Sequence, residues 1–206
     1  LGADITYVEK EGYPPLKISG KKLEKDKVQI NGNVSSQYIS ALLLIAPSLP
    51  NGLVIELIGE ITSVPYIKMT LTLLASIGVE VSWNDDTITI QPKPIIDNTT
   101  VVVESDWSSA SYYYSLVALS PKSEITLSSY KKNSLQGDSV LAEIYKKLGV
   151  ETTYGENSIS LKNTNPLTVE PLNLNLISAP DIAQTIAVTC FGLGIECNLT
   201  GLHTLK

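Results

Sequence analysis

The segment IGVEVSWNDDTITI at residues 77–90 decides the fold of this chain, because residues 148–161 repeat its length and pattern as LGVETTYGENSISL. Residues 1–7, LGADITY, are a third copy of its opening. The glycines at the second position of the three copies lie 76 and 71 residues apart. In both long copies, apolar and polar residues alternate on either side of an Asn/Asp/Gly turn, which predicts a β-hairpin.

A second repeated phrase has the same period. The stretches NVSSQYISALLLIAP, DWSSASYYYSLVALS and APDIAQTIAVTCFG contain Ser36, Ser109 and Asp181, which lie 73 and 72 residues apart. Because two independent landmarks share one spacing, the sequence predicts a structural repeat of about seventy residues.

One period is explained by a β-α-β-α-β-β unit. Short β-branched runs predict strands at Lys27–Ile30, Leu53–Ile58, Thr100–Val103 and Glu124–Leu127. Runs of Ala, Leu and Tyr that follow Ser or Asp predict first helices with side-chain N-caps. Apolar spacing near 3.6 predicts second helices at Pro65–Ile77 and Asp138–Leu148, each closed by a glycine.

The predicted fold class is therefore α/β (α+β). We expect the end of one unit at residues 1–26, complete units at 27–99 and 100–165, and the first half of a fourth unit after them. No unit of this size buries both of its helices alone, so we expect the units to pack around a shared helical core.

Composition excludes several classes of protein. The chain has 206 residues, 43% of them hydrophobic, which suffices for a packed core. Its net charge is −6 and all fifteen basic residues are Lys, which argues against a nucleic-acid partner. No apolar run is long enough to span a bilayer and no secretory leader opens the chain, so we expect a cytoplasmic protein without a membrane partner. The chain begins with Leu1 rather than Met and ends at Lys206 directly after the uncapped stretch LHTL, so we expect it to be an internal piece of a longer chain.

No motif for a metal or a nucleotide cofactor is present. Cys190 and Cys197 lie seven residues apart in an apolar segment, which favours buried thiols in a reducing compartment over a disulfide or a metal pair. His203 is the single histidine, so a Ser-His-Asp triad is unsupported. Without a metal-spaced His/Cys cluster, a Walker loop or a Rossmann glycine pattern, we expect neither metal nor cofactor.

The first-helix N-termini are the candidate binding site. Ser35, Ser36 and Gln37 stand where free backbone N–H groups and the helix dipole favour an anion, and a phosphate could bind there without Arg. The alternative is that the serines only cap the helix. The parallel Ser108 and Ser109 favour this alternative, because they show how general the cap is.

Four further residues each have a structural and a functional interpretation. Ser63 and Tyr66 open the predicted second helix, with Pro65 in its first turn, and could be a cap and a packed aromatic. Asp181 follows a proline at a helix start, so it is either an N-cap or a carboxylate that accepts a proton from a substrate hydroxyl. Asp106 has the same ambiguity, and we interpret it as structural.

The chain resembles the 5-enolpyruvylshikimate-3-phosphate (EPSP) synthases, the enolpyruvyl transferases of the shikimate pathway. The phrases that carry the resemblance are EGYPPLKISG, VSSQYISALLLIAP, SVPYIKMTL, SDWSSASYYY, NSLQGD and APDIAQTIA. They are collinear with the middle of that family and cover nearly all of the chain. The combination of VSSQ, SVPY and PD is specific, whereas each phrase alone would be weak.

The resemblance implies a fold and a set of roles. It implies the enolpyruvyl transferase fold of two lobes with three units each, with residues 1–104 in one lobe and 105–206 in the other. It implies that Ser35 and Ser36 bind the phosphate of shikimate 3-phosphate, and that Gln37 reaches the ring and the phosphoenolpyruvate side. Ser63 and Tyr66 would complete that pocket, and Asp181 would act as or assist the general base. The intact enzyme would be a cytoplasmic monomer without cofactor, and this piece alone would be inactive.

Two alternatives remain open. The related family that transfers enolpyruvate to UDP-N-acetylglucosamine has the same fold, although VSSQ and SVPY favour shikimate 3-phosphate as the substrate. A non-catalytic repeat domain, in which every Ser and Asp above is only a helix cap, would have no affinity for phosphate.

Overall fold

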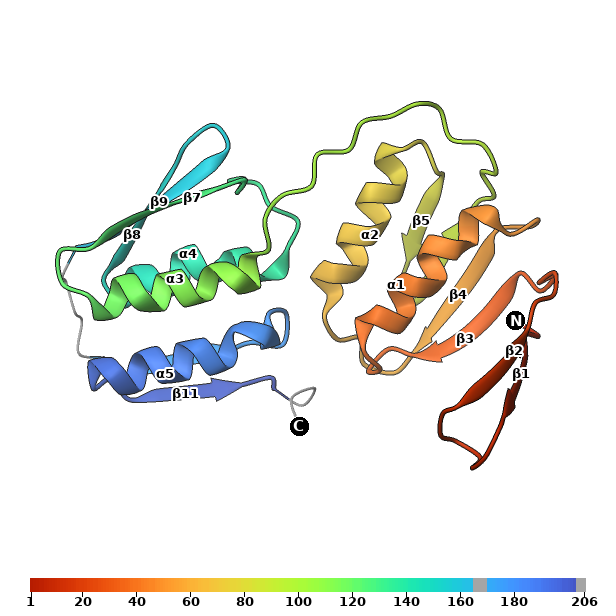
Figure 1. Cartoon of the computed structure of the whole chain (residues 1–206), viewed down its shortest axis with the longest axis horizontal. Helices are drawn as coiled ribbons and strands as arrows, with labels where there is room; N and C mark the ends of the chain where they lie inside the picture. The colour runs from red at the N-terminus through yellow and green to blue at the C-terminus, as the bar shows by residue number, and fades with distance from the viewer. Residues whose placement is uncertain (165–169, 203–206) are drawn as a thin grey trace. The chain divides into compact units, whose positions relative to one another are not determined.

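The computed structural model describes residues 1–164 and 170–202, and Figure 1 shows their helices and strands. The chain divides into two compact units. The first consists of residues 1–61 and 70–99, and the second of residues 62–69 and 100–206. Each unit has its own sheets, and the boundary between the units falls within helix α2 (Val64–Ser76).

The first unit contains a four-stranded sheet in the order β3-β4-β6-β5. Its strands are β3 (Lys27–Asn31), β4 (Leu53–Ile58), β5 (Val81–Asn84) and β6 (Thr87–Ile90). Strands β3 and β4 are parallel and are joined through helix α1 (Ser36–Ile45) and the 3-10 turn η1 (Ala46–Ser48), whereas β4, β6 and β5 are antiparallel neighbours. Helix α2 (Val64–Ser76) connects β4 to the β5–β6 hairpin, so this part of the predicted β-α-β-α-β-β unit is confirmed.

Alternation along the strands separates the two faces of this sheet. Leu53, Ile55 and Leu57 of β4 are buried, and Ile39 and Leu43 of α1 are buried with them. Helices α1 and α2 lie on the same side of the sheet in Figure 1. Because side chains alternate along a strand, the residues between these apolar positions point to the opposite face.

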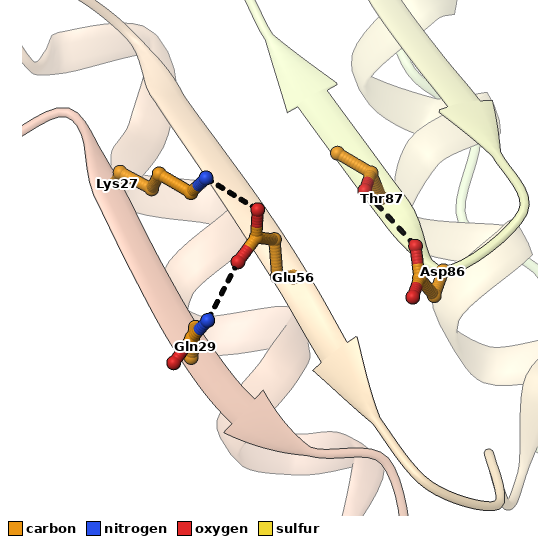
Figure 2. A network of polar contacts seen from close by, with 5 residues as sticks. All are labelled: Lys27, Gln29, Glu56, Asp86 and Thr87. Atoms are coloured by element: carbon orange, nitrogen blue, oxygen red, sulfur yellow. Dashed lines mark hydrogen bonds and ion pairs between the residues drawn. The ribbon is translucent and has the colours of Figure 1, made fainter.

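Polar contacts link β3 and β4 on that outer face. Gln29 lies in register with Glu56, and its Nε2 donates a hydrogen bond of 2.8 Å to the Glu56 carboxylate. Figure 2 shows Lys27 reaching the same carboxylate as an ion pair. The hydrogen bonds from Lys27 and Gln29 lower the pKa of Glu56. These contacts support the register of the parallel pair that leads into α1.

The chain begins with a separate hairpin of β1 (Asp4–Tyr7) and β2 (Leu16–Ser19). All eight of its strand residues are exposed. The hairpin agrees with the predicted end of a repeat, because LGADITY occupies the same place as the first strands of the two longer hairpins.

The second unit repeats this topology. Its strands β7 (Glu124–Ser128), β8 (Val150–Tyr154) and β9 (Ser158–Asn163) form a sheet in the order β7-β9-β8, which corresponds to β4-β6-β5. Strands β10 (Leu172–Asn175) and β11 (Cys197–Thr200) are parallel and are joined through α5 (Ala183–Leu193), as β3 and β4 are through α1. Helices α3 (Trp107–Leu119) and α4 (Leu141–Lys147) complete the unit.

The core of the second unit is centred on α3. Trp107, Tyr114 and Tyr145 are fully buried in one cluster with residues of β9 and α5. The Tyr114 hydroxyl lies 2.8 Å from Thr152 Oγ1 and the Tyr145 hydroxyl 2.9 Å from Thr189 Oγ1. Buried tyrosines of this kind are stable because each hydroxyl keeps a hydrogen-bond partner.

The turns after the second helices confirm the predicted glycine caps. Gly78 has φ +82° and Gly149 has φ +81°. In this left-handed region a residue with a Cβ is strained, which explains why glycine follows the helix in both repeats.

Two predicted elements are wrong. Thr100–Val103 is not a strand: the chain there connects the two units, Val101, Val102 and Val103 are exposed, and the first backbone hydrogen bond is from Ser105 N to Ser129 O. The helix predicted at Asp138–Leu148 begins instead as the 3-10 turn η2 (Gly137–Val140), and only Leu141–Lys147 is α-helical. Within this turn the Asp138 side chain is buried and accepts a hydrogen bond from Ser108 Oγ.

Candidate functional site

The N-terminus of α1 is formed by Ser35, Ser36 and Gln37. Ser35 is the N-cap, with φ −52° and ψ 130°, and its Oγ accepts a long hydrogen bond of 3.4 Å from the Gln37 backbone N–H. Ser35 and Gln37 are exposed, and Ser36 is half-buried. No acidic residue lies in the first turn of this helix. The predicted cap is therefore confirmed, and the positive end of the helix dipole is not neutralised by a carboxylate of its own first turn.

The loop that leads into α1 is held against the loop that follows β4. Because β3 and β4 are parallel, their carboxyl ends lie at the same edge of the sheet. There the Gly32 N–H donates to Ile58 O at 2.8 Å, and Gly32 is buried against Glu60 and Ile61. Ligands of open α/β sheets bind at this kind of edge, outside the carboxyl ends of neighbouring parallel strands.

Ser63 and Tyr66 lie at the start of α2, two and five residues after Ile61. Ser63 has φ +53°, which is uncommon for a residue with a side chain. The Tyr66 N–H donates to Ser63 O at 3.1 Å, and Pro65 occupies the first turn, where its missing N–H has no cost. Further along α2, Thr70 Oγ1 donates to Ser40 Oγ of α1 at 3.1 Å, which joins the two helices.

The N-terminus of α3 differs from that of α1, although Ser108 and Ser109 align with Ser35 and Ser36. Asp106 is the N-cap, and its carboxylate accepts from Ser108 N at 3.0 Å and from Ser109 Oγ at 2.7 Å. Ser108 Oγ donates to the Asp138 carboxylate. Two carboxylates thus occupy the anion-attracting end of α3, and both hydroxyls are already bonded. The structural interpretation of Asp106 is confirmed.

Asp138 is a buried carboxylate that sequence reasoning missed. It has no exposed surface, and burial raises its pKa, against the opposing effect of the Ser108 hydrogen bond. Its Oδ1 has no hydrogen-bond partner within the described part of the chain. The signal was the phrase NSLQGD at residues 133–138, which predicts a helix start but not a contact with a residue thirty positions earlier.

Asp181 lies in the 3-10 turn η3 (Pro180–Ile182), directly before α5. Its side chain caps neither η3 nor α5, whose N-cap positions are Ala179 and Ile182. The Asp181 carboxylate is exposed, and within residues 1–164 and 170–202 no hydrogen bond or ion pair engages it. The interpretation of Asp181 as a helix cap is therefore wrong, and its carboxylate is available to another molecule.

The structure thus gathers the predicted site residues in three places. Ser35, Ser36 and Gln37 share the start of α1 in the first unit, Ser63 and Tyr66 share the start of α2, and Asp181 lies before α5. The start of α2 is grouped with the second unit, where burial and the nearby Asp138 and Asp181 carboxylates raise the pKa of Tyr66. A hydroxyl-rich helix start suits a phosphate, and a free carboxylate suits proton transfer.

The described residues contain neither a disulfide nor a cluster of metal ligands. Cys190 and Cys197 are free thiols, and burial raises the pKa of Cys190 to about 11. No group of three or more His, Cys, Asp or Glu residues there could hold a metal ion. His203 lies outside the described residues. In the same part of the chain no helix is long and apolar enough to cross a membrane.

Comparison with sequences of known proteins gives matches along the entire chain. The family described as EPSP synthase (3-phosphoshikimate 1-carboxyvinyltransferase) matches residues 1–206. A 3-phosphoshikimate 1-carboxyvinyltransferase of Bacteroides fragilis is 48% identical over 207 residues, which cover 100% of this chain and 50% of that protein. One of Haemophilus influenzae is 40% identical over 208 residues, 100% of this chain and 47% of that protein. The chain spans about half the length of the curated relatives it matches.

Solved structures of the same architecture are also similar. An EPSP synthase of Acinetobacter baumannii matches with a TM-score of 0.69 and 19% identity, over 92% of this chain and 43% of that one. The enolpyruvyl transferase NikO of Streptomyces tendae matches with a TM-score of 0.61 and 12% identity, over 96% of this chain and 48% of that one. At these identities the likeness concerns the fold alone, and it confirms the predicted enolpyruvyl transferase type.

Proposed function

Because the chain belongs to the EPSP synthase family, we propose that it forms part of an enzyme that moves the enolpyruvyl group of phosphoenolpyruvate to the 5-hydroxyl of shikimate 3-phosphate. The family membership supports the reaction class, a carboxyvinyl transfer that releases phosphate. The chain spans about half the length of these relatives, which supports the proposal that the remaining groups of the site come from outside these 206 residues.

Ser35 and Ser36 bind the phosphate of shikimate 3-phosphate. The observation that carries this assignment is the open N-terminus of α1, which has an exposed serine cap and no acid in its first turn. The comparable start of α3 is filled by Asp106 and Asp138, so a serine pair alone does not make an anion site. Backbone N–H groups, two hydroxyls and the helix dipole supply the binding energy for the phosphate.

Gln37, Ser63 and Tyr66 complete the pocket for the substrate ring. Gln37 is exposed in the first turn of α1, so its amide can donate to and accept from ring hydroxyls. Ser63 and Tyr66 follow β4, the parallel neighbour of the strand that precedes α1. Residues from two successive helix starts would thereby meet one sugar-like ring.

Asp181 is the general base for the 5-hydroxyl. Its carboxylate is exposed and without a hydrogen bond among the described residues, so it can accept one from a substrate hydroxyl. The hydroxyl oxygen bonds to C2 of phosphoenolpyruvate as Asp181 takes the hydroxyl proton, while C3 gains a proton from an acid in the rest of the enzyme to give a tetrahedral ketal. The conjugate base of that acid then removes a proton from C3, the bond from C2 to the phosphate oxygen breaks, phosphate leaves and the double bond is restored.

The charges of this chain suggest what the rest of the enzyme must supply. Phosphoenolpyruvate is highly anionic, and a transition state of this kind needs cationic groups placed around it. All fifteen basic residues here are Lys, none within the starts of α1 and α2 named above. We therefore propose that Arg residues outside this chain hold phosphoenolpyruvate and that the 206 residues alone do not turn over.

The remaining expectations complete the proposal. Residues 1–104 belong to one lobe of the enzyme and residues 105–206 to the other. The full-length enzyme is a cytoplasmic monomer that needs no cofactor. Transfer to UDP-N-acetylglucosamine is the second candidate reaction, since NikO shows that other enolpyruvyl transferases share this fold.

The experiment is a kinetic comparison in the full-length transferase that contains this chain. Asp181→Asn is expected to lower kcat by about 100-fold or more, because a positioned base contributes about 10²–10⁴-fold. Gln37→Ala is expected to raise KM for shikimate 3-phosphate. Asp97→Asn, in the exposed connection between the units, is the matched control. Unchanged kinetics in both site variants would remove the assignment, and turnover of UDP-N-acetylglucosamine in place of shikimate 3-phosphate would select the second reaction.

A further inference from the structure

The starts of α2, η2 and η3 come together within the second unit, which consists of residues 62–69 and 100–206. Gly137, the first residue of η2, lies against Pro65 of α2 and against Ser178, which precedes η3. A Cβ on Gly137 would come 3.2 Å from Pro65 Cβ and would meet Ser178 O at an even shorter distance. The three segments can therefore approach one another only because residue 137 has no side chain.

Asp138, the next residue, is fully buried in this cluster. Its carboxylate accepts a hydrogen bond from Ser108 Oγ, and it also hydrogen-bonds with the Tyr66 side chain. Because an ionised carboxylate can only accept, the Tyr66 hydroxyl is the donor. Burying a charge is costly unless it has such partners. Asp138 thus links the start of α2 to the start of α3.

Tyr66 is half-buried and also lies near Asp181, whose carboxylate is exposed. Burial and the charges of Asp138 and Asp181 raise the pKa of Tyr66, against the opposing effect of the Ser108 hydroxyl. The phenol therefore keeps its proton at neutral pH and can donate it to Asp138. Two residues that the proposed function assigns to the substrate are neighbours, and one of them is bonded to a carboxylate that has no assigned role.

We propose that Asp138 is a positioning residue, which fixes the Tyr66 hydroxyl beside Asp181 with the phenol proton directed to Asp138. The Tyr66 oxygen then acts toward the substrate ring only as an acceptor, and it receives a hydrogen bond from a ring hydroxyl. Asp138 does not touch the substrate, because it has no exposed surface. This inference rests on the proposed function, in which Tyr66 and Asp181 meet shikimate 3-phosphate.

The test is a double-mutant cycle in the full-length transferase that contains this chain, with the Kd of shikimate 3-phosphate measured by calorimetry. Tyr66→Phe and Asp138→Ala are each expected to raise Kd about fivefold, as the loss of one hydrogen bond does. Because Asp138 acts through the Tyr66 hydroxyl, adding Asp138→Ala to Tyr66→Phe should raise Kd less than twofold further. If Asp138→Ala raises Kd by the same factor in both backgrounds, or leaves Kd unchanged, the positioning role is wrong.

Tyr130→Phe is the matched control for the cycle. It removes a hydroxyl that donates to Asp106 O at 3.0 Å, at the same start of α3 but without a bond to Asp138. Its effect on Kd and that of Asp138→Ala should multiply. If circular dichroism shows that Asp138→Ala is unfolded, Asp138→Asn replaces it in the cycle. The same dependence on Tyr66 is expected for Asp138→Asn, because a neutral amide accepts a weaker hydrogen bond than a carboxylate does.

Urea unfolding of the 206-residue protein separates this inference from the proposed function, because the bond between Tyr66 and Asp138 needs no substrate. The effect of Asp138→Ala on stability should favour Asp138 more when the Tyr66 hydroxyl is present than in the Tyr66→Phe background. Additive effects would show that the bond is absent and would overturn the inference, even in an enzyme that uses shikimate 3-phosphate. Coupled stabilities in an enzyme that does not bind shikimate 3-phosphate would overturn the proposed function and the positioning role together, and would leave only the contact.

Discussion

Gly32 and Ile61 lie in direct contact at the carboxyl edge of the β3–β4 pair: a Cβ on Gly32 would come 3.1 Å from Ile61 Cα and 2.9 Å from Glu60 O. The loop before α1 can therefore approach the loop after β4 only because residue 32 has no side chain. This contact sets where the Ser35–Gln37 turn begins relative to the segment that leads to Ser63.

Gly32→Ala should destabilise the first unit by about 1–3 kcal/mol, because the added methyl group meets backbone atoms that cannot move aside independently. Urea unfolding measures this difference. Gly20→Ala is the control, since nothing lies within 4 Å of its Cβ, and it should be neutral or slightly stabilising. An equal effect of the two substitutions would show that the close approach of Gly32 is not what makes this position sensitive.

Asp138 should make stability fall as pH rises through the acidic range. Burial raises the pKa of Asp138 above its ordinary value of 3.8, so the folded protein binds the proton more tightly than the unfolded chain does. The stabilising contribution of Asp138 to the free energy of unfolding is therefore fully present below about pH 3.8 and is lost as pH rises through the pKa of Asp138 in the folded protein.

The test for Asp138 is the difference in unfolding free energy between the unmodified protein and Asp138→Asn. As pH rises from about 3.8, the unmodified protein should lose stability relative to Asp138→Asn, and the difference should become constant above the pKa of Asp138 in the folded protein. Asp4→Asn, in the exposed strand β1, is the control. A difference that shifts in favour of the unmodified protein with rising pH would mean that the carboxylate is stabilised by the fold.

Cys190 should react slowly with thiol reagents in the folded protein. With a pKa of about 11, only about one-thousandth of this thiol is ionised at pH 8, against about a quarter of a free cysteine. In Cys197→Ser, the remaining thiol should react with a disulfide reagent at least 100-fold faster in urea than when folded. Similar rates in both conditions would contradict the buried position of Cys190.

Much of the fold could be predicted because each repeat carries its own local signals. The alternating segments 77–90 and 148–161 fix the hairpins, and the glycines that close the second helices are needed for their positive φ. The strand predicted at Thr100–Val103 is wrong because a β-branched run indicates strand propensity but does not show whether a neighbouring strand is available to pair with it. In the first unit Lys27–Asn31 pairs with β4, whereas the same position of the next repeat is used to connect the units.

The candidate site was predictable to the extent that it is local. The cap of α1 follows from Ser35 and the helical run after it, and the structure confirms that cap. The contact between Ser108 and Asp138 could not be predicted, since it joins residues thirty positions apart and depends on how α3 and η2 pack. For the same reason the sequence could not distinguish the open start of α1 from the filled start of α3.

The assignment of Ser35 and Ser36 to the phosphate is the central claim, and calorimetric titration of shikimate 3-phosphate into the 206-residue protein at low salt tests it most directly. We expect weak binding that Ser36→Ala reduces at least fivefold and that Ser109→Ala, the matched serine of α3, leaves unchanged. Circular dichroism of each variant shows that it is folded. Binding that is equally strong in Ser36→Ala, or no binding by the folded protein, would contradict a phosphate site preformed at the start of α1.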